Sequence, residues 1–157
     1  MVFSEEMLTR VKTASKIAKT SPGPPTIQKG SKQWNLDIEF AEENFLDMSF
    51  KVFVRQNMND LENFSCGIQM VQVGKRTMLS RYNGSNHENN VAKYECHIHN
   101  ATPESINKED RNPEHADTRV TDRYNDVESA FKCLCEDYNI KLSPSRQSDL
   151  FGDMLLQ

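Results

Sequence analysis

The sequence predicts an α+β fold, in which an antiparallel sheet of about five strands forms a meander and carries an N-terminal helix and one or two C-terminal helices. Two observations predict this class. Apolar and polar residues alternate in successive segments of the middle of the chain, which is typical of half-buried strands, whereas both ends show the helical spacing of apolar residues. With 157 residues, the chain is long enough to bury a core, so we expect one domain over residues 1–157.

The N-terminal helix is expected over residues 1–19. Ser4 is a suitable N-cap, and the acidic residues Glu5 and Glu6 follow in the first turn, where they interact favourably with the helix dipole. The prolines of the next segment lack a backbone donor and end the helix. We therefore predict a Pro/Gly linker over residues 20–33.

The sheet is expected over residues 34–99. A turn at Gly74 returns the strand Thr77–Tyr82 beside the strand before it, and a further strand follows over Lys93–His99. Three earlier segments show strict alternation, with apolar positions at Trp34, Leu36, Ile38 and Phe40; at Met48, Phe50, Val52 and Val54; and at Phe64, Cys66, Ile68 and Met70.

The C-terminal part is predicted to contain a long loop and then helices. Residues 101–125 are polar and show no sustained period, so we expect a loop that includes short helical turns at most. Helices are expected over residues 126–156, the first capped by Asn125 or Asp126 and the second beginning at Ser143. The first helix should cross the sheet with an apolar stripe of Val127, Ala130, Phe131, Leu134 and Tyr138.

The composition favours a cytoplasmic protein without a membrane span. Hydrophobic residues make up 36% of the chain and charged residues 27%, and no run of about 18 apolar residues is present. The chain begins with acidic residues where a signal peptide would be basic, so export is not expected. In a reducing cytoplasm the four cysteines should be free thiols, with Cys66 and Cys96 in the core.

Charge is unevenly distributed along the chain, whose net charge is −4. Residues 1–33 hold six Lys and Arg against two Glu, so this arm carries +4 and residues 34–157 carry −8. A basic arm suits direct contact with nucleic acid, whereas an acidic body repels phosphate and suits a protein partner with a basic surface. The simpler interpretation, a solvated surface in both parts, stays open.

Three of the four histidines lie within thirteen residues and mark the candidate site. In a strand, His97 and His99 point to the same side with Cα atoms about 6.5–7 Å apart. Neutral imidazoles at this spacing are suited to zinc, and His87 and His115 are the candidate further ligands. A pair of hydrogen-bonded structural histidines is the alternative.

The same residues allow a second chemistry, metal-independent cleavage of a phosphodiester. One imidazole would take the proton of a ribose hydroxyl while another protonates the leaving oxygen, and these roles would fall to His97 and His99. Arg81 would hold the phosphate. Arg81, Tyr82 and Asn83 are accordingly the candidate binding residues, because a tyrosine ring can stack on a base.

Three motifs of the chain match a known pattern: Asn83-Gly84-x-x-His87-x-Asn89, His97-Ile98-His99 and Asp137-Tyr138-Asn139-Ile140. In these motifs the chain resembles a family of small proteins of bacteria and of their phages or mobile elements. The resemblance covers about residues 34–140, and Ser85 stands where that family usually has a proline. It implies a small α+β domain and an accessory role in genetic conflict. A more distant resemblance over residues 81–99 is to small ribonuclease toxins.

Two hypotheses about function follow. The first is a non-enzymatic interaction protein of a phage or mobile element, such as an anti-CRISPR-like inhibitor of a host nucleic-acid-guided defence, with a zinc held by the histidine cluster. Its partner would be a protein with a basic surface, such as a nucleic-acid-binding effector. The second is a ribonuclease of toxin type. The acidic isoelectric point, about 5.6, favours the first.

Overall fold

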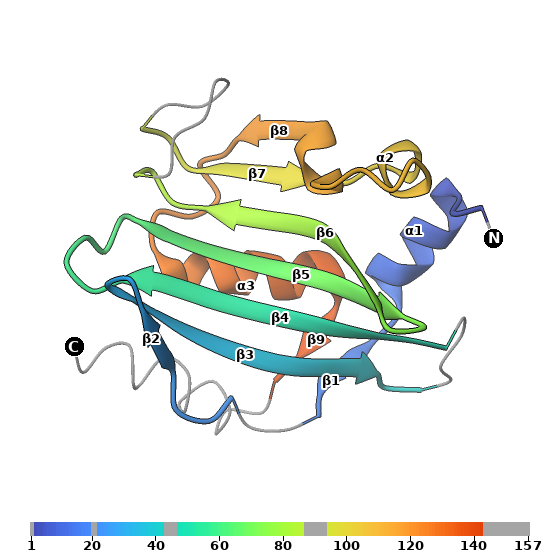
Figure 1. Cartoon of the computed structure of the whole chain (residues 1–157), viewed down its shortest axis with the longest axis horizontal. Helices are drawn as coiled ribbons and strands as arrows, with labels where there is room; N and C mark the ends of the chain where they lie inside the picture. Colours follow the sequence, from blue (N-terminus) through green and yellow to red (C-terminus); the bar gives the residue numbers. More distant parts are fainter. Residues whose placement is uncertain (1, 20–21, 43–46, 87–93, 143–157) are drawn as a thin grey trace.

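One large sheet organises the chain (Figure 1), as seen in a computed structural model that describes residues 2–19, 22–42, 47–86 and 94–142. The described residues form nine strands in the order β8-β7-β6-β5-β4-β3-β1-β9, with β2 paired to β3. The pairing is antiparallel except between β1 and β9. The α+β class is therefore confirmed, although the prediction of about five strands was too low.

Four long strands and one helix build the centre of the fold. The strands β3 (Ser31–Phe40), β4 (Met48–Asn57), β5 (Phe64–Gln72) and β6 (Lys75–Asn83) form the predicted meander. Helix α3 (Val127–Tyr138) crosses one face of this meander (Figure 1). The alternating apolar residues of the strands face α3 and are buried with its apolar stripe, which stabilises the fold by about 25 cal/mol per Å² of apolar surface removed from water.

The ends of α3 are defined by local hydrogen bonds. The side chain of Asp126 accepts a hydrogen bond of 2.8 Å from the backbone N–H of Ser129, as a capping residue does. The helix ends where Asn139 takes a left-handed conformation with φ of 53°. Asp126 was one of the two predicted N-caps, and the second predicted C-terminal helix lies outside the described residues.

The N-terminal helix is shorter than predicted. Helix α1 (Glu5–Thr13) begins after Ser4, whose hydroxyl accepts from the backbone N–H of Met7 at 3.1 Å, but the expected extension to residue 19 is wrong. The chain instead continues as β1 (Lys16–Ala18), which pairs with β3 and with β9 (Ile140–Lys141). Three residues of strand carry too little of a pattern to be recognised against the helical spacing before them.

The side chain of Lys16 joins these N-terminal elements to α3. It is fully buried, and its ammonium group donates hydrogen bonds to the carbonyls of Ala14 at 2.8 Å and Tyr138 at 2.6 Å. The same nitrogen lies 5.7 Å and 5.4 Å from the ring centroids of Phe40 and Phe50. Lys16 thus satisfies carbonyls at the carboxyl ends of α1 and α3.

Two further segments differ from the predictions. The expected linker over 20–33 contains β2 (Thr26–Gln28) and the start of β3. The expected loop over 101–125 contains two short helical turns, which the prediction allowed, and one strand that was not predicted; all three elements are too short to show a period. They are α2 (Pro103–Asn107), the 3-10 helix η2 (Pro113–Ala116) and β8 (Asp117–Val120).

Replacement of Lys16 by methionine should destabilise the fold. The Lys16→Met variant removes the donor to the buried carbonyl of Tyr138 and the partly buried carbonyl of Ala14, so we expect the free energy of unfolding at pH 7 to fall by about 1–3 kcal/mol in urea denaturation. Lys19→Met, at an exposed position, is the matched control. Equal stability of the two variants would contradict the role of Lys16.

The pH dependence of stability tests the same residue. Burial lowers the pKa of Lys16 to about 8, below its ordinary value of 10.5. Between these values the unfolded chain keeps the proton that folded Lys16 has lost, so the contribution of Lys16 to stability rises as the pH passes from 8 to 10.5. Burial also raises the pKa of thiols such as Cys66 and Cys135, which lowers stability over the same range in every variant. We therefore expect the free energy of unfolding of Lys19→Met minus that of Lys16→Met to increase from pH 8 to 10.5.

Candidate functional site

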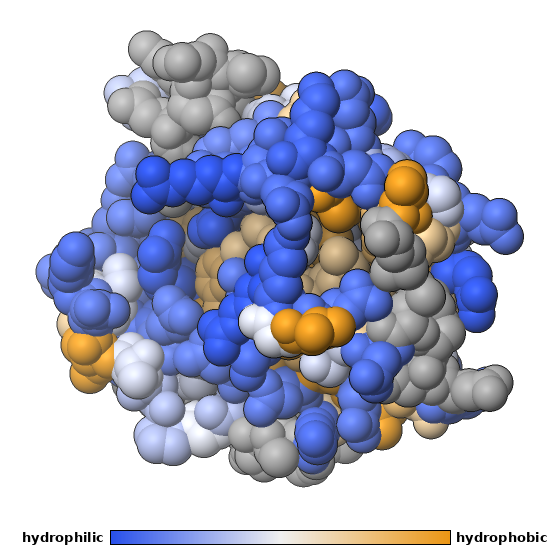
Figure 2. All heavy atoms as spheres, turned by 45° about the vertical axis from the view of Figure 1, so that its right-hand side comes forward, coloured by the Kyte–Doolittle hydropathy of each residue, from blue (hydrophilic) through white to orange (hydrophobic). Residues whose placement is uncertain are grey.

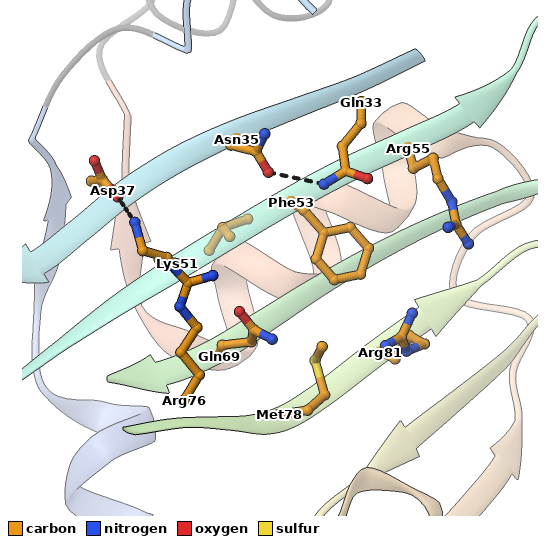
Figure 3. Close-up of a pocket in the computed structure, with 11 residues that line it drawn as sticks. Gln33, Asn35, Asp37, Lys51, Phe53, Arg55, Gln69, Arg76, Met78 and Arg81 are labelled. Carbon is orange, nitrogen blue, oxygen red and sulfur yellow. Dashed lines mark hydrogen bonds and ion pairs between the residues drawn. The ribbon is translucent and has the colours of Figure 1, made fainter. Parts of the chain in front are cut away.

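The face of the meander opposite α3 forms an open groove (Figure 2). Its volume is about 560 Å³, and its rim is hydrophilic, whereas its floor shows more hydrophobic atoms. The outward residues of β3 to β6 line it (Figure 3), because the alternation that buries one set of side chains under α3 turns the other set to this face. The charged and aromatic members are Asp37, Lys51, Phe53, Arg55, Arg76 and Arg81.

One row of directly paired residues crosses the groove. Asn35 on β3 pairs with Phe53 on β4, which pairs with Gly67 on β5. Gly67 pairs with Arg81 on β6, and Arg81 pairs with His99 on β7 (His97–Asn100). Residues paired in this way share a face of the sheet, so residues far apart in the sequence meet in one line.

The ring of Phe53 lies over Gly67. A Cβ atom at Gly67 would come within 2.3 Å of Cε1 of this ring, so only glycine leaves room for it. The guanidinium carbon of Arg81 lies 5.2 Å from the ring centroid, within the range of a cation–π interaction. Phe53 therefore forms part of the floor of the groove, with Arg81 beside it (Figure 3).

The groove carries more positive than negative charge. Lys51 pairs with Asp37 at 2.8 Å. Arg55 and Arg76 have no ion pair with any residue that the structure describes. Burial and then the positive charge of Arg81 lower the pKa of Arg55. The charges of Arg55 and Arg81 thus repel each other, and only Arg81 has a described carboxylate, Glu114, beside it, so the environment of Arg55 favours a bound anion.

Three of the predicted site residues do come together at the edge of this face. The ring centroids of His97 and His99 are 5.0 Å apart, and those of His99 and His115 are 4.9 Å apart. His97 and His99 lie on the same side of β7, as predicted. They are buried, however, with 0% and 5% exposure, because β8 and η2 continue the fold beyond β7.

The hydrogen bonds of His97 define a structural imidazole. Ser65 donates to Oδ1 of Asn83 at 2.7 Å, and Nδ2 of Asn83 lies 3.3 Å from Nε2 of His97. Nδ1 of His97 lies 2.9 Å from the carbonyl of Glu95. An amide nitrogen only donates and a carbonyl only accepts, so His97 carries its proton on Nδ1 and accepts at Nε2. Both ring nitrogens have partners, so this arrangement does not fit a zinc ligand at His97.

The outer part of the cluster centres on a buried carboxylate. Glu114 is 1% exposed, and its Oε2 accepts from Nε of Arg81 at 3.3 Å and lies 3.9 Å from Nε2 of His115. Its Oε1 is buried and has no hydrogen-bond partner within the described ranges. Nδ1 of His99 lies 2.8 Å from the hydroxyl of Thr118 on β8. His115 is exposed and Glu114 links it to Arg81.

Zinc binding stays a prediction. In the parts of the chain that the structure describes, no group of three or more His, Cys, Asp or Glu could hold a metal ion. His87, the other proposed ligand beside His97, His99 and His115, lies outside those parts. Metal analysis of the purified protein tests this prediction.

The three predicted binding residues have different environments. Arg81 lines the groove. Tyr82 is buried on the α3 side, where its hydroxyl donates to Asp137 at 2.6 Å, and burial raises its pKa. Asn83 is buried in the hydrogen-bond chain to His97.

The sequence analysis did not identify Phe53, Arg55, Arg76 or Glu114. The signal for Phe53 and Arg55 was present, since they alternate with the apolar positions of the β4 segment and so had to face away from the core. Glu114 follows a proline in a segment expected to be loop, and only the docking of η2 against β6 and β7 buries it.

Comparisons with protein families, with curated proteins and with solved structures found no match. The resemblance to proteins of phages and mobile elements therefore stays a prediction. Where the chain is described, none of its helices has the length and apolar character needed to cross a bilayer.

Truncation of the two ends of the histidine cluster should have different effects. His97→Ala leaves the buried amide of Asn83 without its acceptor, so we expect the free energy of unfolding to fall by about 1–3 kcal/mol. His115→Ala removes an exposed ring and should change it by at most about 0.5 kcal/mol. Chemical denaturation of both variants measures the difference, and an equal loss would contradict the structural role of His97.

Proposed function

We propose that this protein is a binding protein whose open sheet face takes an anionic partner. The observation that carries the proposal is the presence of two cations, Arg55 and Arg76, that have no ion pair with any described residue. They line a groove that also holds Arg81 and Lys51 and has Asp37 as its acidic residue. A cleft with one sign of charge concentrates ligands of the opposite sign and speeds their association.

The environment of Arg55 strengthens this argument. Its guanidinium is partly desolvated and lies close enough to Arg81 for their charges to interact. Glu114 already pairs with Arg81, whereas no described carboxylate pairs with Arg55. A bound phosphate or carboxylate would accept hydrogen bonds from Arg55 and offset its remaining repulsion from Arg81. The groove volume of about 560 Å³ is within the range of ligand sites in proteins.

A binding groove is compatible with the predicted non-enzymatic interaction protein. Inhibition of a host defence, the mobile-element origin and a partner with a basic surface all stay predictions. The positive charge of the groove favours an anionic partner and not the predicted basic one, since Arg55 and Arg76 would repel a basic protein surface.

The groove cations should control binding of a polyanion that has no rings. We expect the wild type to bind inorganic polyphosphate more weakly as salt rises, and the double variant Arg55→Gln/Arg76→Gln to bind about tenfold more weakly at low salt with a smaller salt dependence. Isothermal titration calorimetry at two salt concentrations measures both quantities.

Arg119→Gln is the matched control for these variants. Arg119 is exposed on β8 and pairs with Ile98, so it belongs to the other face of the sheet. Its replacement should leave polyphosphate binding unchanged. If the wild type does not bind polyphosphate, or if the double variant binds as tightly as Arg119→Gln, the proposed function is wrong.

A ribonuclease is the second candidate, supported by the position of the histidine cluster beside Arg81. Because both nitrogens of His97 are engaged, the acid and base would be His99 and His115, whose ring centroids are 4.9 Å apart. Arg81 would neutralise the phosphate. This assignment replaces the predicted pair of His97 and His99.

Incubation of labelled single-stranded RNA with the purified protein in EDTA separates the two candidates. A binding protein leaves the RNA intact, which is the result we expect. Cleavage that is lost in His115→Ala, a variant expected to retain its stability, would instead establish the ribonuclease. Gel electrophoresis of the products gives the readout.

A further inference from the structure

An aromatic ring stands in the floor of a groove that is otherwise polar and charged. Phe53 is half-buried on the open face, and it is flanked on the same strand by the groove residues Lys51 and Arg55. A simple polyanion such as polyphosphate needs only the cations. A phenyl ring at this position adds affinity for a ligand that also has flat, weakly polar surfaces.

The ring is held in a suitable orientation. One side of it lies against the backbone at Gly67, where even a methyl group would collide with it. Figure 3 looks onto the open face and shows the ring of Phe53 nearly face on, so its other side is directed into the groove. The guanidinium carbon of Arg81 lies 5.2 Å from the centroid of this ring, so a planar group that enters the groove would stack on Phe53 beside this guanidinium, on a ring whose orientation is already fixed.

Groups that recognise base edges and phosphates surround this platform. The amide of Gln33 donates to Oδ1 of Asn35 at 3.0 Å on one side, and the amide of Gln69 lies toward the other (Figure 3). Amides pair well with the donors and acceptors of base edges, and guanidinium groups bind phosphate. Arg55 and Arg76 supply the latter.

The groove also continues beyond β6. A second hollow of about 210 Å³ shares Gln69, Arg76 and Arg81 with the first and extends to Arg111, before η2. This second hollow is mixed in charge, because Glu109 pairs with Lys75, Glu114 pairs with Arg81, and Asp110 also lines it. The cations without an ion pair to a described residue, Arg55 and Arg76, both line the first groove, where they can contact successive phosphates of a linear ligand.

We propose that the ligand is single-stranded nucleic acid, with one base stacked on Phe53 and the backbone following Arg55, Arg81 and Arg76. This proposal rests on the proposed function and deepens it, because it names the class of polyanion. A duplex is a poorer ligand, since the faces of its bases are already stacked on one another. Stacking does not depend strongly on the base, so weak sequence preference is expected.

Fluorescence anisotropy with labelled oligonucleotides tests the stacking contact. Phe53→Leu keeps an apolar side chain but loses the ring, so we expect it to bind a ten-nucleotide strand about five- to 150-fold more weakly than the wild type. Phe53→Tyr retains the ring and should bind within about twofold of the wild type. Neither variant should change the affinity for polyphosphate.

A comparison of ligands on the wild type tests the proposal without any variant. A strand of the same length that lacks its bases keeps the phosphates, and we expect the wild type to bind it as weakly as Phe53→Leu binds the complete strand. The corresponding duplex should also bind more weakly than the single strand.

The outcomes distinguish this proposal from the proposed function. If polyphosphate binds but the strand with bases binds no better than the strand without them, or if Phe53→Leu matches the wild type, the stacking proposal fails and the anionic groove remains. Equal affinity for duplex and single strand would overturn it as well. If neither polyphosphate nor any oligonucleotide binds, both proposals fail together.

Discussion

The packing of α3 against one face of the four-stranded meander is the constraint on which the other features depend. Side chains alternate across a strand, so burial of one set beneath the helix obliges the other set to face outward. The apolar residues of β4, such as Phe50 and Val52, contribute to the core, and for the same reason Phe53 and Arg55 line the groove. Stability and the candidate function therefore use opposite sides of the same strands.

The pairing register of the strands brings the outward residues of the sheet together in one site. The row from Asn35 through Phe53 and Gly67 to Arg81 exists because each pair is directly opposed across its ladder. The pairing shifts between Ile68 and Gln69, where β5 and β6 lose their regular register. On one side of this irregularity the phenyl ring lies over Gly67, and on the other the groove is lined by amide and cationic side chains.

The local charge of the groove differs from the net charge of the chain. The protein carries −4, which favoured a basic partner, yet the groove on its open face is cationic. Net charge sums over all surfaces, whereas a ligand responds to the potential of the surface that it touches. The histidines show a similar contrast. The spacing of His97 and His99 suggested a reactive site, but the structure places His97 in a buried chain of hydrogen bonds that runs through Asn83 to Ser65.

The sequence by itself determined the long elements, because alternation identified β3, β4 and β5, the turn at Gly74 located β6, and helical spacing identified α3. The capping chemistry of Ser4 and Asp126 marked two helix starts. Tertiary structure alone decided the short strands β1, β2, β8 and β9, which have too few residues for a period and form only by pairing with a neighbour. It also decided burial of His99 and the meeting of Phe53 with Arg81, because both depend on contacts between segments that no local pattern encodes.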